Sequence, residues 1–445
     1  MIKTTTTQKL GSFYSWSVVS MLWVLLFLNY ADRQAICGIF PALEQEFGFS
    51  KFQLGLIGSM FIWVYAAAAF FAGFLSDHAK RKPFILGGCL FWSLVTMGTS
   101  ICSKFWHFLV VRGLEGMGEA FYFPSANSLI ADYHTEEKRS TALAAHQSGV
   151  YMGTIAGSWL GGWLAEYYGW QYGFYFFGGL GVIVSILLFF FLKEPRRLSA
   201  EQKNRMLSAP LNQEVFAEIT EKESSLSMLE TLFYLLKRPV VVLLVLSFMS
   251  SNVVTMIFLT WMPTFLYEKF HMTLPTAGFF AVAFIQLSSA LSALGSGWIS
   301  DQCSRHFQNG RVVMQFLCLL LGGGAIFFIG SATKIATLLV AMIFFGICKG
   351  GYDAGLFSSL FDYVEPKVRG SASGFLSSCG YFGGALGPVI VGAVTTYGGA
   401  HSGALNRMSM TIASSAGAYG VAALLLLAVL IVTRVKTSQG STTEV

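Results

Sequence analysis

Long apolar runs dominate the sequence, and each is long enough to cross a lipid bilayer. A transmembrane helix needs about 20 predominantly apolar residues. Runs of this kind occur at approximately 16–40, 52–75, 83–102, 105–131, 140–165, 170–192, 239–266, 275–299, 311–331, 335–361, 370–396 and 409–433. The sequence therefore predicts an all-α polytopic membrane protein with twelve transmembrane helices.

The composition indicates that the solvent of this chain is a bilayer. The 445 residues are 54% hydrophobic and only 12% charged, whereas soluble proteins carry about 25% charged residues. The first apolar run is too long for a signal peptide, so we expect it to remain as a helix. The seven Cys residues include no pair with CxxC spacing, so neither a disulfide framework nor a metal site is expected.

Two sequence repeats divide the chain into halves. "DYHTEEKRSTA" from Asp132 recurs as "DYVEPKVRGSA" from Asp362, with an offset of 230. "GFLSDHAKRK" from Gly73 recurs as "GWISDQCSRH" from Gly297, with an offset of 224. We expect an N-terminal six-helix half (1–192), a polar linker loop (193–238) and a C-terminal six-helix half (239–445). Duplicated units of this kind build transporters whose substrate site lies between the halves.

Basic residues predict the orientation, because Lys and Arg concentrate in cytoplasmic loops. With a cytoplasmic N-terminus, 21 of the 29 Lys and Arg residues are cytoplasmic, five lie on the opposite side and three lie within spans. We therefore expect a multi-pass protein of the inner or plasma membrane. Both termini and the linker should be cytoplasmic.

Charges within spans are rare, and they mark functional sites by default. Seven occur here: Asp32, Arg33, Arg112, Glu115, Glu119, Lys349 and Asp353. Three of them, in the run 105–131, are spaced three and four residues apart: Arg112, Glu115 and Glu119. They therefore share one face of their helix. A carboxyl group in a poorly hydrated cavity can take up a proton, and Arg offers a planar fork to an anion. The set suits coupled binding of an anion and a proton, although paired ions that only fix helix packing would look similar.

Further polar residues supplement these charges. Candidates for substrate contact are Tyr65, Gln147, Tyr151, Asn252 and Gln286. His146 could be a proton relay or a hydrogen-bonded structural residue. Acids beside bases also occur at one end of spans two and eight, as Asp77 with Arg81 and Asp301 with Arg305. We expect these to gate the cytoplasmic side by locking the halves together; simple positive-inside anchoring is the alternative for the bases.

The first repeat, "GFLSDHAKRK", resembles the loop 2–3 signature of the major facilitator superfamily, and "GWISDQCSR" resembles its weaker second copy. One departure is Lys80, where the family usually has Gly. The resemblance extends over nearly the whole chain. It implies the two-half fold and transport by alternating access.

Two branches of that superfamily share further motifs with this chain. The chain resembles the anion:cation symporters in the motifs "NYADR", "RGLEGMGEAFYFP" and "GW" at 169–170. This resemblance implies that Asp32 and Glu119 are the protonatable pair. It also implies that Arg33 and Arg112 bind the substrate or tune the pair. The chain also resembles the Spinster branch, which carries lysolipids and sphingoid phosphates. The features shared with that branch are "FWSLVT" at 91–96 and a residue other than Gly at position 80, here Lys80. The number of polar cavity candidates favours a small organic anion such as a sugar acid. A lipid carrier should instead have an apolar lateral opening.

Other classes of function fit the sequence less well. No Walker loop, zinc-type cluster or large soluble domain is present, so we expect no enzyme activity, no cofactor and no nucleic-acid partner. The antiporter-type Gly-Pro signature is absent from span five, which favours symport. We also expect a monomer in the lipid bilayer. Adding 230 to Glu119 gives Lys349, so we expect these two oppositely charged positions to face the same central cavity from opposite halves. We expect Lys349 to contact the anion in one gating state and to rest on Asp353 when the substrate is absent.

Overall fold

A computed structural model describes residues 12–78, 81–193, 228–306, 309–365, 368–398 and 403–440. Within these residues, nine helical segments are long and apolar enough to cross a membrane. Three more segments, 81–99, 105–133 and 136–167, complete the twelve spans of the fold. The predicted twelve-helix membrane fold is thereby confirmed.

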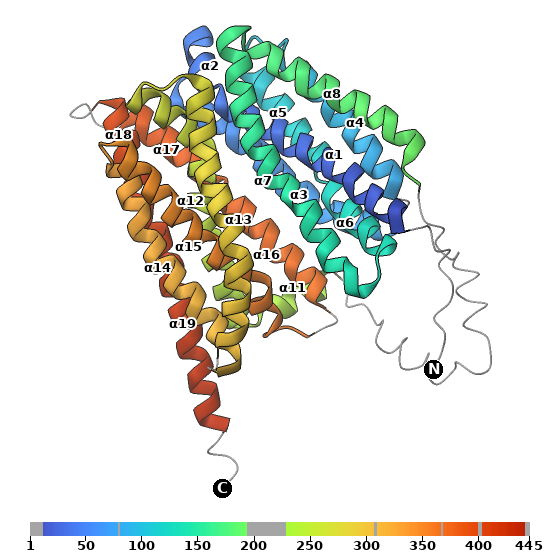
Figure 1. Ribbon diagram of the computed structural model, residues 1–445. Coiled ribbons are helices and arrows are strands. Elements are labelled where there is room, and N and C mark those ends of the chain that lie inside the picture. Colours follow the sequence, from blue (N-terminus) through green and yellow to red (C-terminus); the bar gives the residue numbers. More distant parts are fainter. Residues whose placement is uncertain are drawn as a thin grey trace.

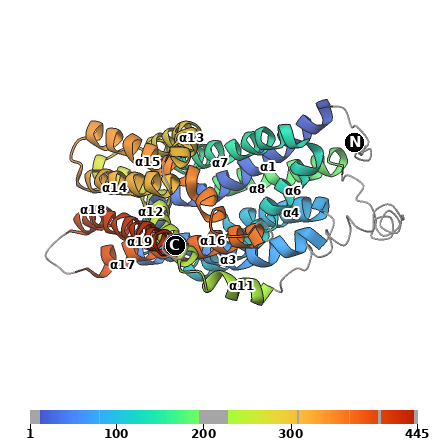
Figure 2. The same ribbon diagram turned by 90° about the horizontal axis from the view of Figure 1, so that it is seen from below.

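The helices form two groups that lie side by side (Figure 1). The N-terminal half holds α1 (Ser12–Gly38), α2 (Phe40–Phe47), α3 (Lys51–His78), α4 (Arg81–Thr99), α5 (Phe105–Glu119), α6 (Tyr122–Tyr133), α7 (Glu136–Tyr167) and α8 (Trp170–Phe191). The C-terminal half holds α12 (Pro239–Phe270), α13 (Leu274–His306), α14 (Gly310–Ser331), α15 (Ile335–Phe361), α16 (Arg369–Gly384), α17 (Leu386–Tyr397), α18 (Ala404–Ser414) and α19 (Ala416–Gly440). Figure 2 shows the same two groups from below.

Ion pairs and hydrogen bonds join the two halves at one end of the molecule. We call the end where α8 stops and α12 starts the linker end; it is the lower end in Figure 1, and α2 and α18 mark the opposite, far end. At the far end, Lys51 Nζ bonds to Glu44 of its own half and to Glu268 of the other half. Nearby, Glu166 Oε2 accepts a hydrogen bond of 2.7 Å from the backbone N–H of Leu274. These contacts between the halves close the far end in this structure.

Three of the expected spans are divided, and proline explains two of the divisions. A proline inside a helix lacks the N–H donor and its ring clashes with the carbonyl four residues earlier. Pro124 lies four residues after Ala120, where α5 gives way to α6. Pro388 lies four residues after Gly384, where α16 ends. The runs at 105–131 and 370–396 therefore each consist of two helices. The run at 409–433 is also divided, at Ser415 between α18 and α19, where the sequence has no proline.

The end of the predicted linker loop is helical. α11 (Met228–Leu236) has an apolar face whose Leu235 is buried against the C-terminal half. Tyr234 Oη donates a hydrogen bond of 3.0 Å to Glu365, and Arg238 donates one of 2.7 Å to the carbonyl of Tyr363. The leucine periodicity of "MLETLFYLL" accounts for the helix, which ties the end of the linker to the C-terminal half.

Candidate functional site

A central cavity of about 320 Å³ lies between the two halves. Its volume corresponds to roughly ten water molecules at the density of the liquid. All nine residues that the sequence suggested for substrate binding line it: Arg33, Tyr65, Arg112, Gln147, Tyr151, Asn252, Gln286, Lys349 and Asp353. They come from seven helices of both halves, so the fold brings the predicted residues together.

Arg33 occupies the N-terminal wall of this cavity. Its Nη2 lies 2.6 Å from Glu119 Oε2, and its Nε donates to the same oxygen at 3.1 Å. The rings of Tyr30, Phe61 and Tyr65 surround the guanidinium, with centroids 4.4, 4.4 and 4.8 Å from Cζ. Aromatic faces attract a cation in this arrangement. The side chain is still 18% exposed to the cavity, so an entering anion can reach it.

Glu119 and Asp32 do not line the cavity. Glu119 is 2% exposed, and its Oε1 has no hydrogen-bond partner among the described residues. Asp32 Oδ1 accepts the backbone N–H of Arg33 at 2.7 Å, and Oδ2 accepts the hydroxyl of Thr96 at 3.3 Å. The expectation that Glu119 faces the same central cavity as Lys349 was therefore wrong. Arg33 lies between Glu119 and the cavity, whereas Asp32 contacts Thr96 of α4.

Arg112 is held by its neighbour on the same helix face. Its Nη1 lies 2.5 Å from Glu115 Oε2, one turn later on α5, as the three-residue spacing predicted. Thr99 donates a hydrogen bond of 3.3 Å to the other oxygen of Glu115. The guanidinium also lies 4.6 Å from the centroid of the Phe61 ring, which it shares with Arg33. Phe61 thus places the two guanidinium groups on the same side of the cavity.

Lys349 provides the positive charge of the C-terminal wall. Its Nζ lies 2.5 Å from Asp353 Oδ2, one turn along α15. The aspartate side chain is 40% exposed and the lysine side chain 15% exposed, so both can be reached from the cavity. Lys349 thus pairs with Asp353 on its own helix, and its role toward a substrate stays a prediction.

The charges of the site fall into three pairs with one acid left over. Arg33 pairs with Glu119, Arg112 with Glu115, and Lys349 with Asp353. Among the described residues, Asp32 has no basic side chain within ion-pair distance, and it is 5% exposed. An isolated buried carboxylate is costly, whereas its protonated form can stay buried. The arrangement suits uptake and release of a proton near Asp32.

Sequence reasoning missed several cavity residues, and the repeat could have found two of them. Adding 230 to Gln147 and Tyr151 gives Ser377 and Tyr381, and both line the cavity from α16. Tyr30 also lines it and stands inside the quoted motif "NYADR". The offset that linked Glu119 to Lys349 was therefore informative at other positions.

His146 does not line the cavity. Its Nε2 lies 3.0 Å from Tyr122 Oη, and that hydroxyl also bonds to the carbonyl of Leu22. The imidazole is fully buried within the N-terminal half. These contacts favour the structural alternative given for His146 over a proton relay.

The expected gating residues are only partly described. Arg81 bonds to Asp132 and to the carbonyl of Ser128, both in its own half. Arg311 and Asp362, at the positions 230 residues later, form the same pair with both distances 2.9 Å. These contacts join α4 to α6 and α14 to α15 instead of joining the halves. The side chains of Asp77, Asp301 and Arg305 lie outside the described residues, so their gating role stays a prediction.

Comparison with known proteins places these features in context. The family model described as Major Facilitator Superfamily matches residues 22–388 and 309–444. The chain is 28% identical to the sodium-dependent phosphate transport protein 1, chloroplastic, of Arabidopsis thaliana, over 86% of this chain and 74% of that protein. It is 29% identical to the chloroplastic ascorbate transporter of the same plant, over 86% and 70%.

A second group of relatives matches over a shorter stretch. The chain is 38% identical to protein spinster homolog 1 of Bos taurus, over 46% of this chain and 39% of that protein. A bacterial homolog of the human lysosomal transporter Spinster, solved in an inward-facing, unoccupied conformation, has a similar fold. Its TM-score is 0.78 at 18% identity, over 94% of this chain and 97% of that chain.

Proposed function

This chain belongs to the major facilitator superfamily, and we propose that it transports a small organic anion such as a sugar acid together with a proton. It is a multi-pass membrane protein and a secondary transporter, not an enzyme. Its relatives include transporters named for phosphate and for ascorbate, both of which are anions. A cavity of about 320 Å³ has room for a small organic anion of this kind.

The position of Arg33 is the observation that carries the proposal. Its guanidinium has Glu119 on the buried side and the cavity on the other. A substrate carboxylate would compete with Glu119 for the same cation, because Arg binds carboxylates through directed, charge-assisted hydrogen bonds. Loss of that cation makes an ionised Glu119 costly in its buried site, so Glu119 would take up a proton as the anion binds. Arg112 and Lys349 would complete the anion site.

Spinster-like transport of a lysolipid is the second candidate, and one observation favours it. The C-terminal wall of the cavity includes the apolar side chains of Phe248, Met256 and Phe357. An amphiphile could place its phosphate at Arg33 and its chain along this wall. The same cations would then bind a lipid phosphate in place of a carboxylate.

Uptake into proteoliposomes distinguishes these candidates. A panel of radiolabelled sugar acids and lysolipids should be tested with an imposed pH gradient, an imposed sodium gradient or neither. We expect a sugar acid to accumulate only with the pH gradient. Accumulation driven by sodium alone would contradict coupling to protons. Transport of lysolipids alone would contradict a small organic anion as the substrate.

The proposed orientation has both termini and the linker in the cytoplasm of a cell membrane, and the far end outside. In a variant without native Cys residues, a Cys replacing Thr273, exposed at the far end, should react in intact cells with an impermeant thiol reagent. A Cys replacing Lys237, exposed at the linker end, should react only after the cells are opened. The reverse pattern would invert the topology.

A further inference from the structure

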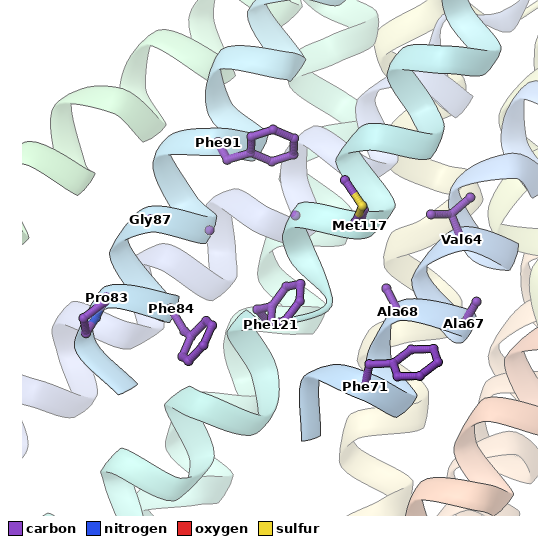
Figure 3. A pocket seen from close by; sticks show the side chains of 12 residues that line it. Val64, Ala67, Ala68, Phe71, Pro83, Phe84, Gly87, Phe91, Met117 and Phe121 are labelled. Carbon is purple, nitrogen blue, oxygen red and sulfur yellow. The ribbon is translucent and has the colours of Figure 1, made fainter. Parts of the chain in front are cut away.

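A second hollow, of about 620 Å³, lies on the side of the N-terminal half, among α3, α4, α5 and α6 (Figure 3). We call it the lateral pocket. Its twelve lining residues are all apolar or glycine; they include Val64, Ala68, Phe84, Gly87, Met117 and Phe121. It shares no lining residue with the central cavity, so it is a separate site.

The lateral pocket covers the depth of about one leaflet. Along α4 it extends from Pro83 to Phe91, which is about 12 Å at 1.5 Å per residue. Half of the hydrocarbon core of a bilayer is about 15 Å thick. Because α4 begins at Arg81 at the linker end, the pocket runs from that membrane surface toward the middle.

The walls of the lateral pocket suit hydrocarbon and not water. A Cβ atom added to Gly87 would meet nothing within 4 Å, so this glycine leaves open space in the wall. Phe71, Phe91 and Met117 are 63%, 39% and 42% exposed and form part of the lining. A buried water needs two to four polar partners, and none of the lining side chains has a charged or hydrogen-bonding group.

Basic residues lie at the linker end of the lateral pocket. Arg81 and Lys82 precede Pro83, the first pocket residue of α4. Lys82 is partly exposed, and its ammonium group donates a hydrogen bond of 2.7 Å to the carbonyl of Phe189. An ammonium group has three donors, so Lys82 can also bind a phosphate. Basic residues at this level of a membrane attract anionic lipids.

We propose that the lateral pocket binds an acyl chain of an anionic phospholipid from the leaflet at the linker end. The head group lies near Lys82 and the chain fills the space beside Gly87. Met117 and Phe121, on either side of the break between α5 and α6, contact this chain. Glu119 lies at the same break, so the bound chain supports the helix end that carries this carboxyl group.

Photolabelling of the full-length protein in liposomes, with no transport substrate present, tests the proposal. The probe is phosphatidylglycerol with a diazirine in its acyl chain, and mass spectrometry locates the labelled peptides. We expect labelling of peptides 64–71 and 83–91 to exceed labelling of α14 at least fivefold. Gly87→Leu, which places a side chain in the space proposed for the acyl chain, should reduce it to the α14 level.

Gly324→Leu is the matched control. Gly324 is exposed on α14, and an added Cβ would also meet nothing within 4 Å, but it lines neither hollow. This variant should label like the parental protein, and both variants should elute as single peaks in size-exclusion chromatography. The proposal would be overturned by uniform labelling of lipid-facing helices, by labelling unchanged in Gly87→Leu, or by labelling concentrated on α12 and α15 of the central cavity. A second probe, phosphatidylcholine with the same diazirine chain, tests the head group, and equal labelling by it would also overturn the proposal.

Discussion

Glu119→Gln should abolish proton-driven accumulation of the substrate. A gradient of two pH units can sustain about 100-fold accumulation with one proton per anion, because each unit is worth about 1.4 kcal/mol. The amide keeps the size of the glutamate and can still accept a hydrogen bond from Arg33, but it cannot carry the proton. We expect the accumulation ratio to fall from about 100 to about 1, while exchange of internal for external substrate continues.

Asp32→Asn should produce the same loss if the two carboxyl groups act as a unit. Asp32 is buried outside the cavity wall and accepts hydrogen bonds from Thr96 and from the backbone of Arg33. Glu46→Gln is the control, because Glu46 accepts a hydrogen bond from Trp170 and lies outside both the cavity and the pair. Normal accumulation by Asp32→Asn would remove Asp32 from the proton pathway. Normal accumulation by Glu119→Gln would overturn the coupling mechanism itself.

The fold could be predicted because a bilayer imposes a simple rule on sequence. Runs such as 239–266 have to be helical, since hydrocarbon offers no partner for backbone polar groups. The break between α5 and α6 depends on one proline, Pro124, and a hydropathy pattern does not respond to it. The helix α11 was missed because its nine residues are too few to span a bilayer and the linker before it is polar. Such details depend on local chemistry that a count of apolar residues does not include.

The sequence allowed us to predict which charged residues belong to the site, but not which of them line the cavity. Charged residues within spans are so costly in lipid that Arg33, Arg112 and Lys349 were expected at a cavity, and the structure places them there. Whether a residue faces the cavity or lies behind another depends on how the helices are rotated. For this reason Glu119 was expected in the wall but lies behind Arg33. The lateral pocket depends in the same way on packing, because Gly87 and Met117 are 30 residues apart in sequence.

Lys349→Met should reduce both stability and transport, and a second substitution should separate the two effects. Breaking a buried ion pair by removing one partner costs about 3–5 kcal/mol, and we expect less here because the Asp353 side chain is 40% exposed. Replacing both partners with apolar residues leaves no stranded charge. The double variant Lys349→Met with Asp353→Leu should therefore unfold at a temperature close to that of the parental protein in a thermal-shift assay.

Transport by this double variant distinguishes a substrate-binding lysine from a structural one. If Lys349 contacts the anion, the stable double variant still lacks one of the three cations around the cavity. Uptake should then fall at least tenfold, mainly through a raised KM, since the remaining cations are on the opposite wall. Lys349→Arg should retain much of the uptake, because it keeps the positive charge beside Asp353. A double variant that transports at the parental rate would make the Lys349–Asp353 pair purely structural, and Arg33 and Arg112 alone would then form the anion site.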